Sequence, residues 1–324
     1  MSCNITAAIC MYNAEHTIAG TLQCLLDQTL QDFNLLIVDD CSTDQSVACV
    51  ERFFAEHPRQ YELVQQHVNQ GVAFERNFVL NHAQTKYVIF IDADDFPLPK
   101  LIEKEYNALN CDQELTAVSS WLQFTDANCN QMRGGLFIGD TTKEEFRKRA
   151  AAGKRIFLPI QTMFNREDAI RVGGFRLDGF PEGKPRYRDF CEDLDLWTRM
   201  SDLYMEGKCI VVLPEVLYRY RKTDGLSSNH FNMIIKMEYV KVNVRRRRKG
   251  LPEISFVEYL NTIPPKEMAK LRRDSQVADD LRNGVFYCRE KKIFKGIGLI
   301  LRSLVTNPSY IFDKLMSNSG LIKK

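Results

Sequence analysis

The chain has 324 residues, enough for one large domain or one domain with an appendage. Its apolar (44%) and charged (27%) fractions are those of an ordinary globular protein. No stretch approaches the ~20 apolar residues of a membrane-spanning helix, and the first residues lack the basic start and apolar core of a signal peptide. The ten cysteines form no C-x-x-C pair, which argues against a zinc site and favours reduced thiols in a cytoplasmic protein.

The net charge of +2 is unevenly divided along the chain. Residues 233–324 carry 20 Lys and Arg against 9 Asp and Glu, a net of +11, whereas residues 1–232 carry 24 against 33, a net of −9. We expect the two parts to meet different partners. The acidic part suits a cation with charged phosphates, and the basic part suits an anionic surface such as a membrane.

The first hundred residues alternate strand-like and helix-like patterns. Strands are predicted at 4–11, 33–38, 61–66 and 87–91, and helices at 15–30, 43–54 and 71–82. Asp44 is predicted to cap the second helix or to lie in its first turn. This alternation predicts an α/β fold, with a mixed, mostly parallel sheet and helices on both faces.

Beyond residue 97 the pattern loosens. We expect helices at 100–109 and 143–152, strands at 116–124 and 209–213, and loops at 133–140 and 178–190. From about residue 231 the chain reads as a basic, mostly helical appendage. Its segment KKIFKGIGLILRSLV (291–305) places apolar side chains on one helical face, as in a helix that lies in a membrane interface. Packing of that face on the main domain is the alternative.

Carboxylates recur where predicted strands end or in the loops beyond. They are Asp39-Asp40, the D-A-D-D run 92–95 after a buried strand, and Glu192-Asp193. In open α/β sheets, ligands bind at the carboxyl ends of the strands. The Asp92-x-Asp94 spacing suits one hard cation. Phosphate oxygens would complete the coordination shell of that cation.

Four motifs in order resemble the family 2 glycosyltransferases. They are CMYNAEHTIAGTLQCLLDQTLQDFNLLIVDDCSTD (10–44), NQGVAFERN (69–77), DADD (92–95), and GGF (173–175) followed by CEDLDLW (191–197). The resemblance implies a GT-A type, Rossmann-like catalytic domain over residues 1–232. Its nucleotide-binding half would be 1–97 and its acceptor-binding half 98–232, with 233–324 as the appendage.

The resemblance also implies nucleotide-binding residues. Asp39 would accept the N–H of a uracil ring, with Asp40, Asn13, Arg76 and Asp92 nearby. For each group a structural role is the alternative to nucleotide binding. The Asp39-Asp40 pair would then cap the following turn, and Arg76 would form a surface ion pair.

For the chemistry, the resemblance implies Asp94 and Asp92 as ligands of Mn²⁺ or Mg²⁺, with Asp95 in support. Asp193 would be the general base of an inverting displacement, and Glu192 would orient the acceptor or the base. The alternative for Glu192 and Asp193 is an acidic first helical turn, and both interpretations can hold together.

One position departs from the family pattern. Where the family often carries a metal-binding histidine after a Tyr-Arg segment, this chain has Lys222-Thr223, and the nearest histidine downstream is His230. Either His230 substitutes, or Lys222 and Arg221 meet the diphosphate, or the cation has one protein ligand fewer.

These features predict a metal-dependent inverting glycosyltransferase of the hexosyltransferase type. It would use a nucleotide sugar, UDP-linked, and a glycan or lipid-linked glycan acceptor, at the inner face of the cell membrane. One alternative is a sugar-phosphate nucleotidyltransferase, disfavoured because no glycine precedes Gly20 in the loop after the first strand. The other is an inactive scaffold that binds anionic surfaces, which the run Arg245–Arg248 favours. A nucleic-acid partner is not expected.

Overall fold

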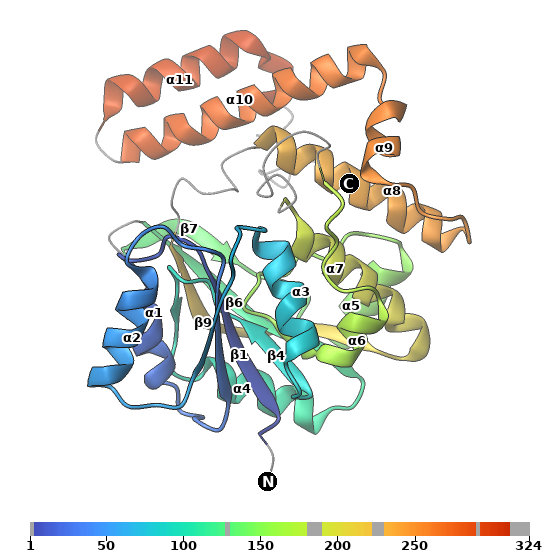
Figure 1. The fold of residues 1–324 in the computed structure, drawn as a ribbon. Coiled ribbons are helices and arrows are strands. Elements are labelled where there is room, and N and C mark those ends of the chain that lie inside the picture. The colour runs from blue at the N-terminus through green and yellow to red at the C-terminus, as the bar shows by residue number, and fades with distance from the viewer. Residues whose placement is uncertain (1–2, 127–129, 180–189, 222–229, 290–291, 312–324) are drawn as a thin grey trace. The chain divides into compact units, whose positions relative to one another are not determined.

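The computed structural model describes residues 3–126, 130–179, 190–221, 230–289 and 292–311. The chain forms two compact units (Figure 1). The larger contains residues 1–223 and 240–253, and the smaller contains 224–239 and 254–324. Helix α8 (His230–Arg248) contributes to both units. The predicted boundary after residue 232 therefore falls inside a helix.

The larger unit is built on a nine-stranded mixed sheet with the order β3-β2-β1-β4-β8-β6-β9-β5, in which β7 pairs with β6. Strands β1 to β4 are parallel where they pair, as are β6 and β9, whereas β8 runs antiparallel to both β4 and β6. The mixed, mostly parallel sheet predicted from the sequence is confirmed. The strands are β1 (Ile5–Met11), β2 (Asn34–Asp39), β3 (Glu62–Gln65), β4 (Tyr87–Phe90), β5 (Phe96–Pro97), β6 (Leu115–Thr125), β7 (Gln131–Phe137), β8 (Met163–Asn165) and β9 (Cys209–Arg221).

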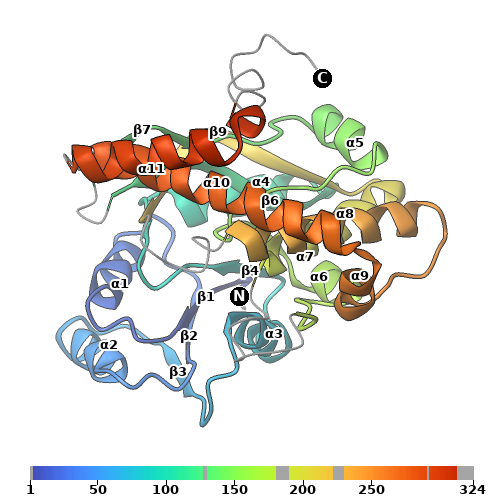
Figure 2. The ribbon, with the colours of Figure 1, turned by 90° about the horizontal axis from the view of Figure 1, so that it is seen from above.

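Helices cover both faces of this sheet, as predicted. Viewed from above, α1 and α2 lie on the opposite side of strands β1 to β3 from α3 (Figure 2). Helix α4 packs on β6, β8 and β9. The helices of this unit are α1 (Ile18–Leu26), α2 (Ser46–Glu56), α3 (Val72–His82), α4 (Leu101–Cys111), α5 (Lys143–Ala151), α6 (Arg166–Arg171), α7 (Glu192–Met200) and the 3₁₀-helix η2 (Ser201–Glu206).

The strand sequences account for the buried centre of the sheet. Strands β1 and β4 are almost continuously apolar and buried, as expected for parallel strands covered on both faces. Strands β7 and β8 were not predicted. The glycines of β7 gave it a loop-like composition, and the three residues of β8 are too few to show a periodicity.

Two element ends also differ from the prediction. Helix α2 begins at Ser46, so Asp44 precedes it, and its carboxylate accepts from the backbone N–H groups of Ser46 (2.9 Å) and Glu15 (3.1 Å). Strand β9 continues past Leu213 to Arg221, with register irregularities beside Pro214 that let it bend and resume pairing with β6.

The smaller unit is helical, as predicted. Besides part of α8 it contains α9 (Phe256–Thr262), α10 (Pro265–Arg289) and α11 (Ile293–Thr306). Helices α10 and α11 pack closely. A Cβ atom at Gly296 would lie 2.6 Å from the carbonyl oxygen of Gly284, so this glycine permits the contact at the cost of helix propensity. Among the described residues, none of the helices combines the length and the apolar character needed to cross a membrane.

The arginine run Arg245–Arg248 is largely engaged within the larger unit. Arg247 pairs with Asp202 and with Glu253, and Arg248 pairs with the same Asp202. The Nε atom of Arg246 donates to the carbonyl of Pro252 (2.6 Å). Arg247 and Arg248 therefore tie residues 240–253 to the rest of the larger unit, and Arg246 bonds within that segment. The run is largely engaged, which weakens the support that it gave to the inactive-scaffold alternative.

Candidate active site

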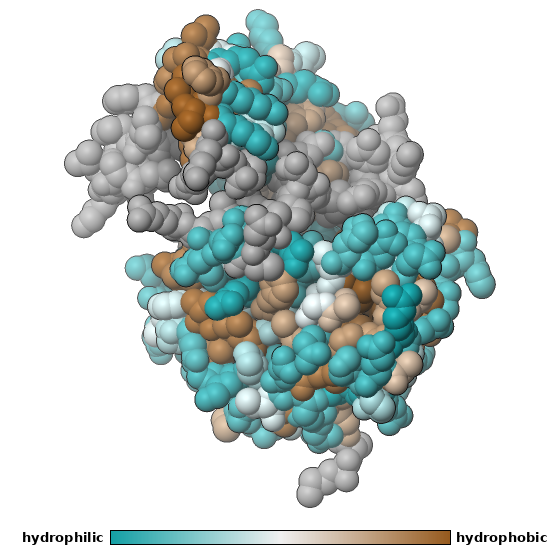
Figure 3. Space-filling model, turned by 90° about the vertical axis from the view of Figure 1, so that its left-hand side faces the viewer, coloured by the Kyte–Doolittle hydropathy of each residue, from teal (hydrophilic) through white to brown (hydrophobic). Residues whose placement is uncertain are grey.

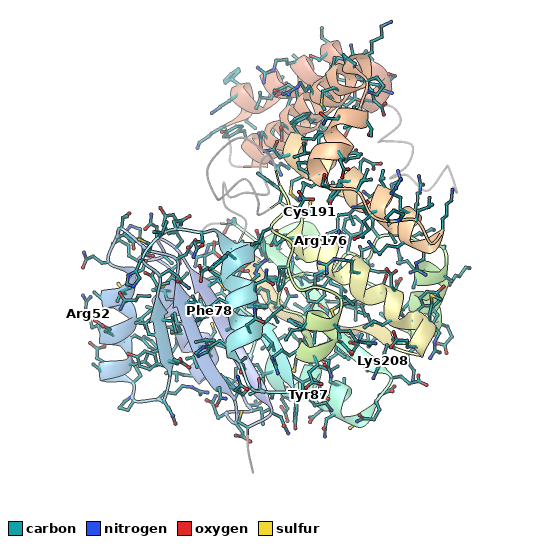
Figure 4. The ribbon with its side chains drawn as sticks, turned by 45° about the vertical axis from the view of Figure 1, so that its right-hand side comes forward. Arg52, Phe78, Tyr87, Arg176, Cys191 and Lys208 are labelled. Atoms are coloured by element: carbon teal, nitrogen blue, oxygen red, sulfur yellow. The ribbon has the colours of Figure 1, made fainter. Side chains whose placement is uncertain are left out.

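The predicted site residues gather at the carboxyl ends of parallel strands. Asp39 ends β2, Asp92 and Asp94 follow β4, and Glu192 begins α7. Figure 4 shows Cys191 and Arg176 at this end of the larger unit, whereas Tyr87, at the start of β4, and Lys208, before β9, lie at the other end. This is the edge at which open α/β sheets bind ligands.

Asp39 is 3% exposed, and its two oxygens differ in their partners. Oδ2 accepts from the backbone N–H of Ser42 (3.1 Å), so the predicted turn-capping contact exists. Oδ1 is buried and has no hydrogen-bond partner within the described structure. A buried acceptor without a donor is costly in free energy, and a ligand N–H would satisfy it.

Asn13 shapes the loop beside Asp39. Its φ is +51°, a left-handed conformation that asparagine tolerates better than most residues. Its Oδ1 accepts from the backbone N–H of Thr43 (2.8 Å), and its own N–H donates to the hydroxyl of Ser42 (2.9 Å). These bonds join the loops after β1 and β2. Contact of the exposed Asn13 side chain with a nucleotide stays a prediction.

Asp40 holds the start of α3. Its two carboxylate oxygens accept from the backbone N–H groups of Gln70 (2.7 Å) and Gly71 (2.9 Å). Gly71 has a φ of +88°, which makes glycine the favoured residue at this turn. Because both oxygens accept from the backbone, the structure gives Asp40 a positioning role, and its contact with a nucleotide stays a prediction.

Glu75, on the first turn of α3, is fully buried beside Asp40. Its Oε2 accepts from the side-chain amide of Gln66 (3.0 Å). Burial, and then the negative charges of Asp40 and Asp39, raise the pKa of Glu75 to about 7. Our sequence reasoning did not single out this residue, although it lies within the motif 69–77.

Arg76 is 5% exposed and joins two motifs. Its guanidinium pairs with Glu192 and lies 3.3 Å from Oδ1 of Asp92. Burial lowers the pKa of Arg76, but the charges of Glu192 and Asp92 outweigh burial and raise it. The surface ion pair considered for Arg76 is therefore wrong, because the ion pair is buried.

Asp92 and Asp94 form the candidate metal centre. Burial, and then the negative charge of Asp92, raise the pKa of Asp94 to about 6. A divalent cation bound between the two carboxylates would offset their negative charges. Within the described ranges no group of three His, Cys, Asp or Glu could hold a metal ion. The two carboxylates fit a cation whose other ligands come from substrate or water.

Asp95, between β4 and β5, ties this segment to the rest of the sheet. It is fully buried, and its Oδ1 accepts from the backbone N–H of Arg221 (2.8 Å), which ties the end of β9 to the D-A-D-D segment. The hydroxyl of Tyr218 lies 3.3 Å from the backbone nitrogen of Asp92 and makes a second tie. Lys222, Thr223 and residues 180–189 lie outside the described residues, as does the side chain of His230.

The candidate base is on the first turn of α7. Asp193 Oδ1 accepts from the backbone N–H of Leu194 (2.7 Å). Burial raises the pKa of Asp193, and the nearby Arg76 only partly offsets this effect. Glu192 is 8% exposed and pairs with Arg76. The acidic first turn and the cluster around Arg76 therefore coexist, as the sequence analysis allowed.

Two residues that the sequence reasoning missed brace α7 and the Gly-Gly-Phe segment. The side-chain amide of Asn77 bonds to both the N–H (2.8 Å) and the carbonyl (2.5 Å) of Phe175. Arg199 pairs with Asp195 and donates to the carbonyl of Gly174 (2.6 Å). Asn77 closes the motif 69–77, so it was visible in the sequence, but its partner 98 residues away was not.

Comparison with known proteins identifies the class. The family model described as Glycosyl transferase family 2 matches residues 6–173, more than half of the chain. The chain belongs to this family. A putative glycosyltransferase, EpsE of Bacillus subtilis, is 25% identical over 248 residues, which cover 76% of this chain and 83% of that protein.

Two solved structures share the fold. The mannosyltransferase PcManGT from Pyrobaculum calidifontis, in complex with GDP-Man and Mn²⁺, has a TM-score of 0.55 at 18% identity, covering 99% of this chain and 81% of that one. TarS 1–349 of S. aureus, in complex with UDP-GlcNAc, has a TM-score of 0.53 at 16% identity, covering 91% and 90%. At these identities the likeness shows the fold alone, and it confirms the predicted GT-A type of architecture.

Proposed function

We propose that the protein transfers a sugar, with inversion, from a UDP-sugar to a hydroxyl group of a glycan or lipid-linked glycan acceptor. The reaction would serve the synthesis of a surface polysaccharide or lipopolysaccharide. The observation that carries the proposal is the cluster in which the buried Arg76 joins Asp92, after β4, to Glu192, beside Asp193. It brings a candidate metal centre and a candidate base to one edge of the sheet.

The chemistry assigned to this cluster is a single displacement. The oxygen of the acceptor hydroxyl attacks the anomeric carbon and gives its proton to Asp193, while the bond from that carbon to the diphosphate breaks. Burial raises the pKa of Asp193, which brings its basicity closer to that needed near neutral pH. Mn²⁺ or Mg²⁺ bound by Asp92 and Asp94 would supply Lewis-acid stabilisation of the leaving diphosphate.

The proposed donor base rests on Asp39. Its Oδ1 has no hydrogen-bond partner in the described structure, which supports Asp39 as the acceptor of the ring N–H of uracil. Guanine also carries a ring N–H of this kind, whereas neutral cytosine does not. The UDP-GlcNAc complex of TarS supports uridine, and the GDP-Man complex of PcManGT makes guanosine the alternative base.

Membership of family 2 argues against the nucleotidyltransferase alternative. The inactive-scaffold alternative has lost its main support, because most of the arginine run is engaged inside the fold. A cytoplasmic location at the inner face of the cell membrane stays a prediction.

Calorimetric titration of the full chain with UDP, GDP and CMP, each with and without Mn²⁺, tests the proposal. We expect Mn²⁺-dependent binding of UDP and no binding of CMP. Asp39→Asn, which replaces an acceptor by an amide that can present a donor, should weaken UDP binding by about 10- to 100-fold. The exposed Asp27 offers a matched control, Asp27→Asn. Failure of a folded sample to bind any of the three nucleotides would contradict the proposal.

A further inference from the structure

One face of α11 is apolar and exposed. Its large hydrophobic side chains are between 41% and 95% exposed, and Phe294 (95%) and Val305 (84%) are the extremes. Their spacing of three and four residues places them on one stripe of the helix. Figure 3 shows hydrophobic side chains gathered beside hydrophilic ones in this unit. The stripe, here called the α11 stripe, consists of Ile293, Phe294, Ile297, Leu301, Leu304 and Val305.

The packing of α11 on α10 fixes this orientation. The opposite side of α11 carries Gly296 and Ser303, both buried. Arg302 pairs with Asp280 of α10, and the side-chain amide of Asn307 donates to Asp274 (2.8 Å). Because these contacts hold the helix pair together, α11 cannot turn its apolar stripe toward α10.

The charge around the stripe is positive. Helix α11 contains no Asp or Glu, and Lys292 and Lys295, at its start, are exposed. The ammonium of Lys295 lies 4.1 Å from the ring centre of Tyr287. Residues 254–324, which leave out the paired arginine run, carry 13 Lys and Arg against 7 Asp and Glu, a net of +6. The cationic excess thus remains after the engaged arginines are removed.

We propose that the α11 stripe docks in the interface of an anionic phospholipid bilayer, with the helix lying along the surface. Burial of the apolar side chains and attraction of the flanking lysines to lipid phosphates act together there. The 14 residues of α11 are too few to span a bilayer. A second copy of the chain suits this face less well, because a two-fold contact through it would oppose like charges. This inference is independent of the proposed sugar transfer.

Sedimentation with lipid vesicles tests the docking. The full chain is mixed with vesicles of phosphatidylglycerol and phosphatidylcholine, or of phosphatidylcholine alone, at low and high salt. We expect binding to the anionic vesicles, weakened by salt. The combined variant Phe294→Ser, Leu301→Ser and Val305→Ser should lower the partition coefficient about tenfold or more. The matched control is Ile138→Ser, Phe157→Ser and Met205→Ser, exposed apolar residues of the larger unit, and it should bind like the wild type.

The outcomes that overturn the docking are distinct. The first is that the wild type does not bind anionic vesicles, and the second is that the combined stripe variant binds them as well as the wild type. The third is that the wild type is a dimer that binds no vesicles and that the stripe variant is a monomer. Far-ultraviolet circular dichroism checks that the variant keeps its helices. If it unfolds, Lys292→Gln with Lys295→Gln, which leaves the stripe intact, should lose the preference for anionic vesicles. Retention of that preference would contradict the proposal. Nucleotide titration of the stripe variant should be unchanged, which separates this test from that of sugar transfer.

Discussion

Arg76 is the residue on which the arrangement of the site depends most. It is buried, and it lies between Glu192 and Asp92, which would otherwise be like charges near one another. A guanidinium can bond two carboxylates at once and stays charged when buried, which a lysine does less well. These contacts engage its two terminal nitrogens, whereas its buried Nε has no hydrogen-bond partner in the described structure. Arg76 therefore positions the two carboxylates, and its contact with a nucleotide stays a prediction.

At Asp193, replacement by asparagine should abolish transfer and leave nucleotide binding within about threefold of the wild type. The side chain keeps its size but loses the ability to take a proton. Product formation and calorimetry on the same sample check this prediction. Asp32→Asn, at an exposed aspartate, provides a comparison for the loss of one charge. Near-normal turnover of Asp193→Asn would remove Asp193 as the base.

Glu75 gives the protein a dependence of stability on pH. Its pKa is about 7 in the folded state against 4.5 for an ordinary glutamate, so the folded state binds the proton more tightly. The stability that this carboxyl contributes is present below pH 4.5 and is lost as the pH rises through about 7. The slope is at most about 1.4 kcal/mol per pH unit.

Glu75→Gln should therefore flatten the fall in the free energy of unfolding between pH 5 and pH 8. Urea unfolding at the two pH values measures it, and Glu51→Gln, an exposed glutamate on α2, is the control. An unchanged difference between the two pH values would show that Glu75 is not the group responsible.

At the scale of elements, α3 and the Gly-Gly-Phe segment are locked by one side chain. Asn77 bonds to both backbone groups of Phe175. Gly174 has a φ of +60°, and a Cβ there would lie 2.6 Å from Oδ1 of Asn77. The segment therefore needs both a glycine and an asparagine in these places.

Asn77→Ala should destabilise the protein by about 2–4 kcal/mol, because it leaves two backbone groups without partners. Gly174→Ala should also destabilise it, through the positive φ and the clash. In the Asn77→Ala background its cost should fall, because the clash is gone while the backbone strain remains. Thermal and urea unfolding of the wild type, the two single variants and the double variant complete this double-mutant cycle. Strict additivity would contradict the packing described.

At the scale of the whole molecule, residues 240–253 belong to the larger unit although they follow part of the smaller one in the chain. Val240 and Val244 are buried there, and Arg247 and Glu253 pair with Asp202 and Arg176. A truncation that begins at residue 233 would therefore remove part of the larger unit.

A chain ending at Glu253 should unfold cooperatively and bind nucleotide like the full chain. A chain ending at Arg221 should be less stable by roughly 3 kcal/mol or more, because it loses both the buried valines and the ion pairs. Differential scanning calorimetry of the two truncations measures the difference. Equal stability would mean that residues 240–253 contribute little to the larger unit.

The sequence by itself determined the parts of this protein that depend on local pattern. Apolar periodicity fixed the alternation of strands and helices through residue 91, and the spacing of Asp92 and Asp94 after a buried strand indicated the candidate metal centre. The order of four motifs indicated the family, because motif order is a property of the chain alone.

Only the tertiary structure decided which of these residues meet and which partners they have. Arg76 and Glu192 are 116 residues apart, and nothing in the sequence between them encodes their contact. Asp39 and Asp40 look equivalent in sequence, yet their hydrogen bonds differ. One carboxylate oxygen of Asp39 has no partner in the described structure, whereas both oxygens of Asp40 accept from backbone N–H groups. The arginine run looked like a free cationic patch until its carboxylate partners were located. Burial and pairing at long range set the chemical role of a charged side chain, and both arise only when distant segments pack together.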